Sequence, residues 1–169
     1  FTSRGNKKEL MEGEKMQSLL NDKNFELIIA DILSDKDFNK IKEIKHHGLN
    51  RLDHSLRVSY YSYKIARFLK LDYKAVARGG LLHDFFYEEN DKSSISKKLK
   101  TLIEHPQYAL KKASSKFELN DKEKNIIVSH MFPVSVSLPK YLESWIVDLV
   151  DDGVAIYEVY KAYSVYLRP

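Results

Sequence analysis

Apolar side chains recur every three or four positions along most of the chain, the spacing that is typical of amphipathic helices. In the first part of the sequence this pattern predicts helices over residues 7–20, 24–33 and 36–46. Asn24 is a suitable N-cap for the second of these helices, and Gly48 is a suitable stop signal after the third. The N-terminal region is therefore expected to be helical.

Two central helices are expected over residues 53–70 and 72–88, and each begins at an aspartate that can cap it. The second helix contains the pair Gly79-Gly80 in its interior. Each glycine costs about 1 kcal/mol of helix stability relative to alanine. We therefore expect another element of the fold to approach the helix closely at this pair.

The C-terminal half continues with helices and shows no strand-like alternation of apolar and polar residues. The expected helices cover 95–103, 106–116 beginning at Pro106, a segment from Asp121 that ends before Pro133, and a long segment after Pro139 that reaches Leu167 with a break near Gly153. The predicted fold class is all-α, a compact single-domain bundle of roughly seven to nine helices. Residues 1–46 are expected to pack as N-terminal helices on a core of residues 47–169.

Composition narrows the chemistry that such a bundle can carry. The 169 residues include six His and no Cys, so any bound metal must be held by His, Asp or Glu. The net charge of +4 does not indicate nucleic-acid binding. Neither a transmembrane run nor a charged-then-apolar leader is recognisable, so a cytoplasmic, membrane-free protein is expected. The first residue is Phe, which leaves open whether the chain is a fragment of a longer one.

The string LLHDFF, residues 81–86, places two polar side chains on an otherwise apolar helix. Burying His83 and Asp84 without partners would cost several kcal/mol. A bound ion would remove this cost, because neutral imidazole and carboxylate are ligands for Fe, Mn, Co, Ni and Zn. The alternative is a locally hydrogen-bonded histidine beside a solvated aspartate.

His83-Asp84 follows His54 by 29 residues and precedes a group of aspartates on a late helix. The order His, then His-Asp, then a distant Asp resembles the HD-domain superfamily of metal-dependent phosphohydrolases. The local strings HSLRV, GGLLHD and WIVDLVDD strengthen this resemblance, which covers roughly residues 47–157.

The resemblance implies a first metal held by His54, His83, Asp84 and a late aspartate. Val150-Asp151 fits the family best at that last position, with Asp148 and Asp152 as alternatives. Binuclear members carry further histidines in between, which are matched here by His105 and His130, with Asp84 bridging two ions. Without a metal, these two histidines could simply begin and end helices.

The implied activity is hydrolysis of a phosphomonoester or phosphodiester in a small, nucleotide-like substrate by a metal-activated hydroxide, with Asp84 and His83 as catalytic residues. One or two divalent ions are expected, drawn from Fe, Mn, Co, Ni, Zn or Mg. Arg51, His47 and Lys112 are candidates for phosphate binding. The alternatives are a mononuclear HD nucleotidase and a non-catalytic metal- or nucleotide-binding regulatory module.

Four tyrosines near the end of the chain recur every three residues, at positions 157, 160, 163 and 166. They are expected either to pack against the N-terminal helices or to form a homodimer interface, where tyrosine is favoured.

Overall fold

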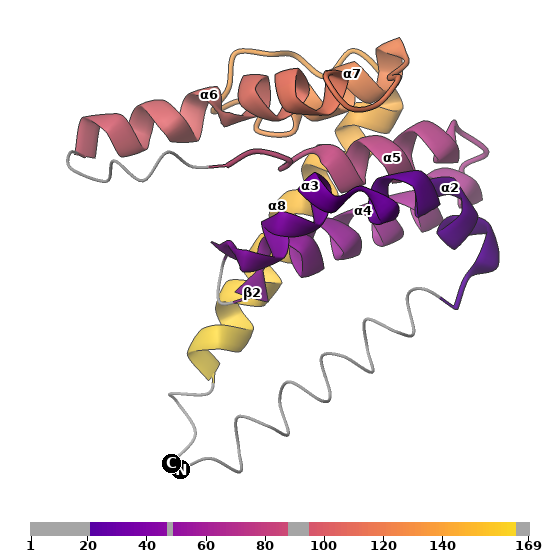
Figure 1. The fold of residues 1–169 in the computed structure, drawn as a ribbon, viewed down its shortest axis with the longest axis horizontal. Helices are drawn as coiled ribbons and strands as arrows, with labels where there is room; N and C mark the ends of the chain where they lie inside the picture. The colour runs from indigo at the N-terminus through magenta and orange to yellow at the C-terminus, as the bar shows by residue number, and fades with distance from the viewer. Residues whose placement is uncertain (1–20, 47–48, 88–94, 165–169) are drawn as a thin grey trace.

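The described part of the computed structural model comprises residues 21–46, 49–87 and 95–164, and it confirms the all-α class (Figure 1). Seven α-helices lie within these residues, together with one 3-10 helix and one pair of two-residue strands. The elements are α2 (Lys23–Ser34), α3 (Lys36–Asn39), η1 (Lys40–Glu43), β1 (Lys45–His46), β2 (Leu49–Asn50), α4 (Arg51–Phe68), α5 (Tyr73–Leu82), α6 (Ile95–Ser114), α7 (Asp121–Ser129) and α8 (Leu142–Ser164). The helix expected over 7–20 falls outside the described residues.

The two strands replace the end of a predicted helix. The expectation of one helix over 36–46 was wrong, because α3 tightens into η1 and the backbone is already extended at Ile44. β1 and β2 then pair antiparallel, with Lys45 opposite Asn50. This short pair leads the chain directly into α4.

Helix α4 is capped three residues earlier than expected. Its N-cap is Asn50, whose side-chain oxygen accepts a hydrogen bond from the Asp53 backbone N–H at 2.9 Å. The Asn50 amide in turn donates to the Asp53 carboxylate at 2.8 Å. Asp53 therefore lies inside the first turn, and Arg51 becomes part of the helix. Helices α2 and α7 also begin slightly early, at caps formed by Asp22 and Asn120.

Two predicted helix breaks are absent from the described helices. Helix α6 runs from Ile95 to Ser114 with Pro106 in its interior, and α8 continues through Gly153. A proline inside a helix removes one backbone hydrogen bond. The released carbonyl has a use in the site described below. Helix α5, by contrast, stops at Leu82, several residues before the expected end.

The close approach expected at the glycine pair is confirmed. A Cβ on Gly79 would lie 2.8 Å from the Ile126 side chain on α7, and one on Gly80 would lie 3.1 Å from the Ser59 Cα on α4. Helix α5 is thus held tightly between α4 and α7, which fixes the position of its C-terminal end.

The apolar core lies where α2, α4 and α5 meet, around buried side chains that include Phe25, Tyr63 and Leu81. Helix α7 closes a smaller cluster against α8 through Ile126 and Val147. Figure 1 shows α6 beside α7, while α8 crosses the bundle obliquely. None of the described helices is long and apolar enough to cross a membrane.

Candidate metal centre

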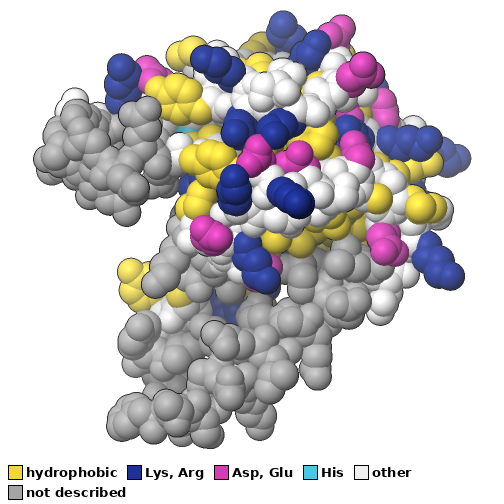
Figure 2. Space-filling model, viewed as in Figure 1, with side chains coloured by type: hydrophobic (Ala, Val, Ile, Leu, Met, Phe, Trp, Pro, Cys, Tyr) yellow, Lys and Arg dark blue, Asp and Glu magenta, His cyan; other side chains and the backbone are white. Residues whose placement is uncertain are grey.

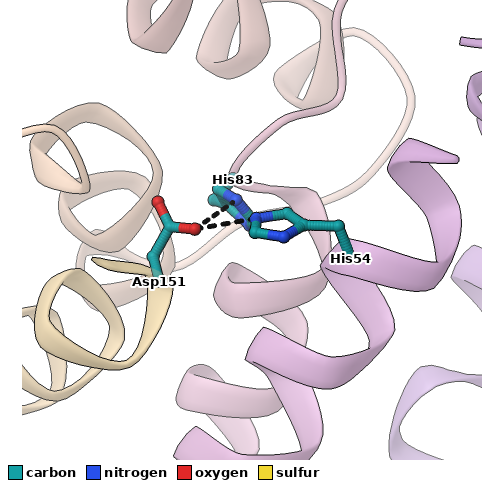
Figure 3. Close-up of side chains that lie close together, drawn as sticks. All are labelled: His54, His83 and Asp151. Atoms are coloured by element: carbon teal, nitrogen blue, oxygen red, sulfur yellow. Dashed lines mark hydrogen bonds and ion pairs between the residues drawn. The ribbon is translucent and has the colours of Figure 1, made fainter. Parts of the chain in front are cut away.

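Three helices bring ligand-type side chains to one buried point (Figure 3). His54 comes from the first turn of α4, His83 follows the last residue of α5, and Asp151 lies on α8. One oxygen of Asp151, Oδ1, lies 2.8 Å from His54 Nε2 and 3.6 Å from His83 Nε2. These three side chains form one group with the spacing needed to hold a metal ion.

A second set of side chains adjoins the first through Asp84. His105 on α6 and His130 at the end of α7 place their Nε2 atoms 2.9 Å apart. Asp84 Oδ1 lies 3.3 Å from the first of these nitrogens and 3.7 Å from the second. The other oxygen, Oδ2, lies 3.9 Å from His83 Nε2. Asp84 therefore contacts both sets of side chains with one carboxylate.

Three of the histidines are oriented by backbone carbonyls that their helices leave free. His83 Nδ1 donates to the Gly80 carbonyl at 2.7 Å, and His130 Nδ1 donates to that of Ile127 at 2.8 Å. Both carbonyls belong to the last turn of a helix, where the usual N–H partner is missing. In the interior of α6, Pro106 has no N–H for the Leu102 carbonyl, and His105 Nδ1 donates to it at 2.8 Å.

The fourth histidine is oriented by a buried carboxylate. His54 Nδ1 donates to Glu158 Oε2 at 2.9 Å, and Arg57 contacts the other oxygen of Glu158 at 3.3 Å. Such a carboxylate–histidine pair typically supports a metal ligand. Glu158 was not among the residues predicted from the sequence. Its signal was its position seven residues after Asp151, two helical turns along the same face of α8.

These hydrogen bonds give all four imidazoles the same orientation. Because a carbonyl or carboxylate can only accept, each Nδ1 carries a hydrogen, and each Nε2 points inward. In His54 both ring nitrogens face carboxylates, so without a cation Nε2 also carries a hydrogen and donates to Asp151 at 2.8 Å. The lone pairs of His105 and His130 face one another at 2.9 Å unless a proton or a cation lies between them. His83 Nε2 is buried and has no hydrogen-bond partner. A divalent cation fits this donor set, since imidazole and carboxylate are its usual ligands.

Charge at the site follows from burial and from the neighbouring groups. Burial lowers the pKa of His54, but Asp151 and Glu158 outweigh it and raise the pKa to about 10. Burial raises the pKa of Asp151, but the interactions with His83 and His54 outweigh burial and lower this pKa to about 2. Burial, reinforced by His83, lowers the pKa of His130 to about 4. Without an ion, a proton on His54 therefore balances the carboxylates.

Comparison with known proteins agrees with this geometry. The family model for the HD domain matches residues 51–153, which is more than half of the chain. The chain belongs to the HD domain family. Members of this family are in general metal-dependent phosphohydrolases. No curated protein and no solved structure matches the chain.

Among the three late aspartates of the HD domain, only Asp151 faces the histidines. Asp148 Oδ1 instead accepts a hydrogen bond from the Phe132 backbone N–H at 3.1 Å. Burial raises the pKa of Asp148 to about 7, and the negative charge of Asp152 adds to this effect. Asp152 itself is exposed to solvent. The geometry thus favours Asp151 over the two alternatives as the last ligand of the HD centre.

Arg51 lies inside the HD domain rather than at an open entrance. Its side chain is buried, with Nε 3.8 Å from Asp84 Oδ2. Nη1 donates to the Phe86 carbonyl at 2.8 Å, and the guanidinium lies 4.1 Å from the centroid of the Phe86 ring. The structure therefore places Arg51 against Asp84 and the segment that follows it. His47 lies outside the described residues.

A pocket of about 460 Å³ lies beside the histidine cluster. Lys112, the third residue predicted to bind phosphate, lines this pocket. Its wall includes Phe86, whose ring stacks on His105 with centroids 5.0 Å apart. Lys112 Nζ lies 4.9 Å from the centroid of the Tyr87 ring. Figure 2 shows lysine and arginine side chains interspersed with acidic ones on the face in view, where hardly any histidine is visible.

Proposed function

We propose that the chain is an HD-type phosphohydrolase that hydrolyses a phosphomonoester or phosphodiester in a small phosphorylated substrate with two divalent ions. The observation that carries this proposal is the inward direction of four Nε2 atoms toward two buried carboxylates, with His54 at Asp151 and the other three histidines at Asp84. A cluster without a ligand would leave the acceptor Nε2 atoms of His105 and His130 facing one another at 2.9 Å and His83 Nε2 buried without a hydrogen-bond partner, and both are costly.

The proposed ligands divide into two sets that share Asp84. His54, His83, Asp84 and Asp151 would hold the first ion, and His105 and His130 would hold the second. Two groups of metal-ligating type lie among the described residues, one of His54, His83 and Asp151 and the other of His83, Asp84 and His130. They agree with this division in part, since they separate Asp151 from His130 but share His83 and do not include His105. Mixed imidazole and carboxylate ligands favour Fe, Mn, Co, Ni or Zn.

Bound divalent ions supply Lewis acidity, which lowers the pKa of a water molecule and neutralises phosphate oxygens. The side chains of this chain provide the orientation. Asp84 faces both ligand sets, so its carboxylate is assigned to orient the attacking water and accept its hydrogen bond. Arg51 holds the turn that carries Asp84 through its bond to the Phe86 carbonyl. Deep burial of the histidines keeps bulk water away.

The pocket beside the centre is proposed to receive the rest of the substrate. Its lining combines the aromatic residues Phe86, Tyr87 and Tyr108 with the cations of Lys111 and Lys112. Aromatic surfaces accept a planar ring, and lysines attract phosphate oxygens. A nucleotide-like substrate is consistent with both features.

The test is to measure bound metal and turnover in the same preparations. Purified protein loaded with Mn²⁺ or Fe²⁺ is assayed by elemental analysis and with a panel of phosphomonoesters and phosphodiesters. His83→Ala and Asp84→Ala are expected to lose both metal and turnover. Asp148→Asn is the matched control, because it alters a buried aspartate on α8 that does not face the histidines. Retention of metal and activity in both alanine variants contradicts the proposal.

A one-ion centre is the second candidate, and one observation favours it: His54, His83 and Asp151 already form a complete metal-ligating group among the described residues. Stoichiometry separates the two. In a two-ion centre, His105→Ala lowers the metal content from two ions per chain toward one. In a one-ion centre, the content stays near one in both proteins.

A further inference from the structure

Helix α8 differs from an ordinary surface helix because both of its sides carry apolar residues. Its buried side mixes Val147 and Val154 with charged residues such as Asp151 and Glu158. Its solvent-facing side carries large apolar residues. Leu149 is 64% exposed and Ile156 is 70% exposed. A surface helix normally buries its apolar stripe. The arrangement indicates a second surface that covers this side of α8.

Six exposed apolar residues of α8 form one stripe, which we call the outer face. At about 100° per residue they fall within an arc of roughly 60° on one side of the helix, and the exposed Tyr157 and Val159 flank this arc on either side. The outer face consists of Leu142, Trp145, Leu149, Ile156, Tyr160 and Tyr163. Two of the four late tyrosines thus belong to it, whereas Tyr166 lies outside the described residues. Tyr160 and Tyr163 are 70% and 66% exposed, so neither of these two is buried against the described N-terminal helices.

The outer face is complementary to itself when a second helix lies antiparallel to the first. A two-fold axis between positions 152 and 153 places Leu149 opposite the partner's Ile156. The same axis places Trp145 opposite the partner's Tyr160, and Leu142 opposite the partner's Tyr163. Every apolar residue of the outer face therefore meets another apolar residue, as a symmetric interface requires.

The antiparallel pairing gives a reason for the glycine at its centre, Gly153, which the packing within one chain does not require. Gly153 lies in the interior of α8, where glycine costs about 1 kcal/mol relative to alanine. A Cβ at this position would meet nothing within 4 Å, so no packing inside the chain requires its absence. Opposite the partner's Asp152, however, a glycine leaves room for two helices to approach closely. If one helix moved along the other by one turn, Asp152 would lie against an apolar side chain of the partner. This favours the register in which Asp152 lies opposite the partner's Gly153.

We propose that two copies of this chain associate through the outer faces of α8, antiparallel, about an axis beside Asp152 and Gly153. At the size of these side chains, the exposed surface of the outer face amounts to roughly 800 Å² per copy. When a second copy covers the whole outer face, the buried area reaches the usual share of each partner in a specific interface. Figure 1 shows the C-terminal end of α8 extending past the other described helices, where a second copy can reach it.

The first test measures the oligomeric state of the full chain by sedimentation and light scattering over a range of concentrations. Wild type is expected to dimerise. Leu149→Lys and Ile156→Lys are expected to weaken the dimer by at least about tenfold, since they place a charge in the apolar stripe. Leu27→Lys is the matched control, because Leu27 is an equally exposed leucine on α2. It should dimerise like wild type.

A second variant separates loss of the dimer from loss of folding. Gly153→Leu adds a side chain where the single chain has open space, so the helix content and thermal stability of the monomer should hold or rise. The dimer should still weaken by at least about tenfold, because the added side chain separates the two helices.

Disulfide trapping tests the register, and the chain has no cysteine of its own. The double variant Leu149→Cys/Ile156→Cys should give a covalent dimer on mild oxidation, whereas Leu149→Cys alone should not. A wild-type monomer at every concentration overturns the proposal, and this is the result expected if residues 1–20 or a different protein cover the outer face. Efficient trapping by Leu149→Cys alone overturns the antiparallel register.

Discussion

Asp148 offers a sharp test of the electrostatics of this site, because its carboxyl is buried beside other acids and accepts a hydrogen bond only from a neutral backbone N–H. The substitution Asp148→Asn keeps an oxygen that can accept the same hydrogen bond from Phe132 and removes the negative charge. We expect this variant to be more stable than wild type at pH 8 and to keep no more than about half of that advantage at pH 4.5.

The magnitude follows from the pKa of Asp148, which rises from 3.8 to about 7 on folding. A carboxyl with a raised pKa costs nothing below pH 3.8, since it is protonated in both states. The cost grows as pH rises toward 7 and is complete above it. When the whole pKa difference is converted to free energy, the charged carboxyl of Asp148 costs up to about 4 kcal/mol of stability. Because Asp152 is exposed and its charge is screened by solvent, we expect about 2 kcal/mol.

The assay is urea unfolding of metal-free protein at the two pH values, since a cation bound near Asp151 would itself lower the pKa of Asp148. The quantity to compare is the difference in unfolding free energy between variant and wild type. Glu118→Gln, which alters an exposed carboxyl, is the control and should change stability by less than about 0.5 kcal/mol at both pH values. The same small change for Asp148→Asn, or greater stabilisation at pH 4.5, would refute the reasoning.

Three further predictions concern the metal ligands and the packing of the helices. Glu158→Gln should weaken metal binding by about 10-fold or more in competition titrations, because Glu158 supports His54. Glu143→Gln should leave metal binding unchanged, because Glu143 is a buried glutamate that contacts no histidine. Equal effects of the two variants would argue against the support of a metal ligand by Glu158. Metal binding at pH 7.5 should release about one proton, because His54, with its pKa of about 10, must lose a proton to become a ligand. Calorimetry in two buffers of different ionisation enthalpy measures this release. The release should vanish above pH 10, and its absence at pH 7.5 would contradict the role of His54 as a metal ligand. Gly80→Ala should destabilise the fold by about 1–3 kcal/mol, because the added Cβ meets the backbone of α4. Gly153→Ala should stabilise the monomer by about 0.5–1 kcal/mol, because its added Cβ meets open space. Chemical unfolding at low protein concentration measures both changes, and changes of the same sign would show that the local space around each glycine does not decide the stability.

Several features of the site could be predicted from the sequence because they depend on residue type and order. With no cysteine available, an ion site had to use histidine and carboxylate, and His83-Asp84 within an apolar string marked its position. The periodic apolar pattern was sufficient for the all-α class, and the glycine pair correctly indicated a close helix contact. These signals are local, so a single sequence carries them.

The helix ends were harder to predict, because they depend on competition between neighbouring caps. Asn50 rather than Asp53 begins α4, and Pro106 does not begin a helix but lies within one. Propensity alone favours a break at a proline. Here the carbonyl that Pro106 leaves free is satisfied by His105, so a local defect of the helix becomes the support of a proposed ligand.

The sequence by itself determined that this chain is helical, that it belongs with the HD proteins, and which residue types a metal site would use. Only the tertiary structure decided which aspartate meets the histidines, because Asp148 and Asp151 lie within one turn of each other and the packing angle of α8 selects between them. It also brought Glu158 to His54 from 104 positions away. Contacts of that range depend on how whole helices pack, and a local pattern of residues does not encode the packing angle.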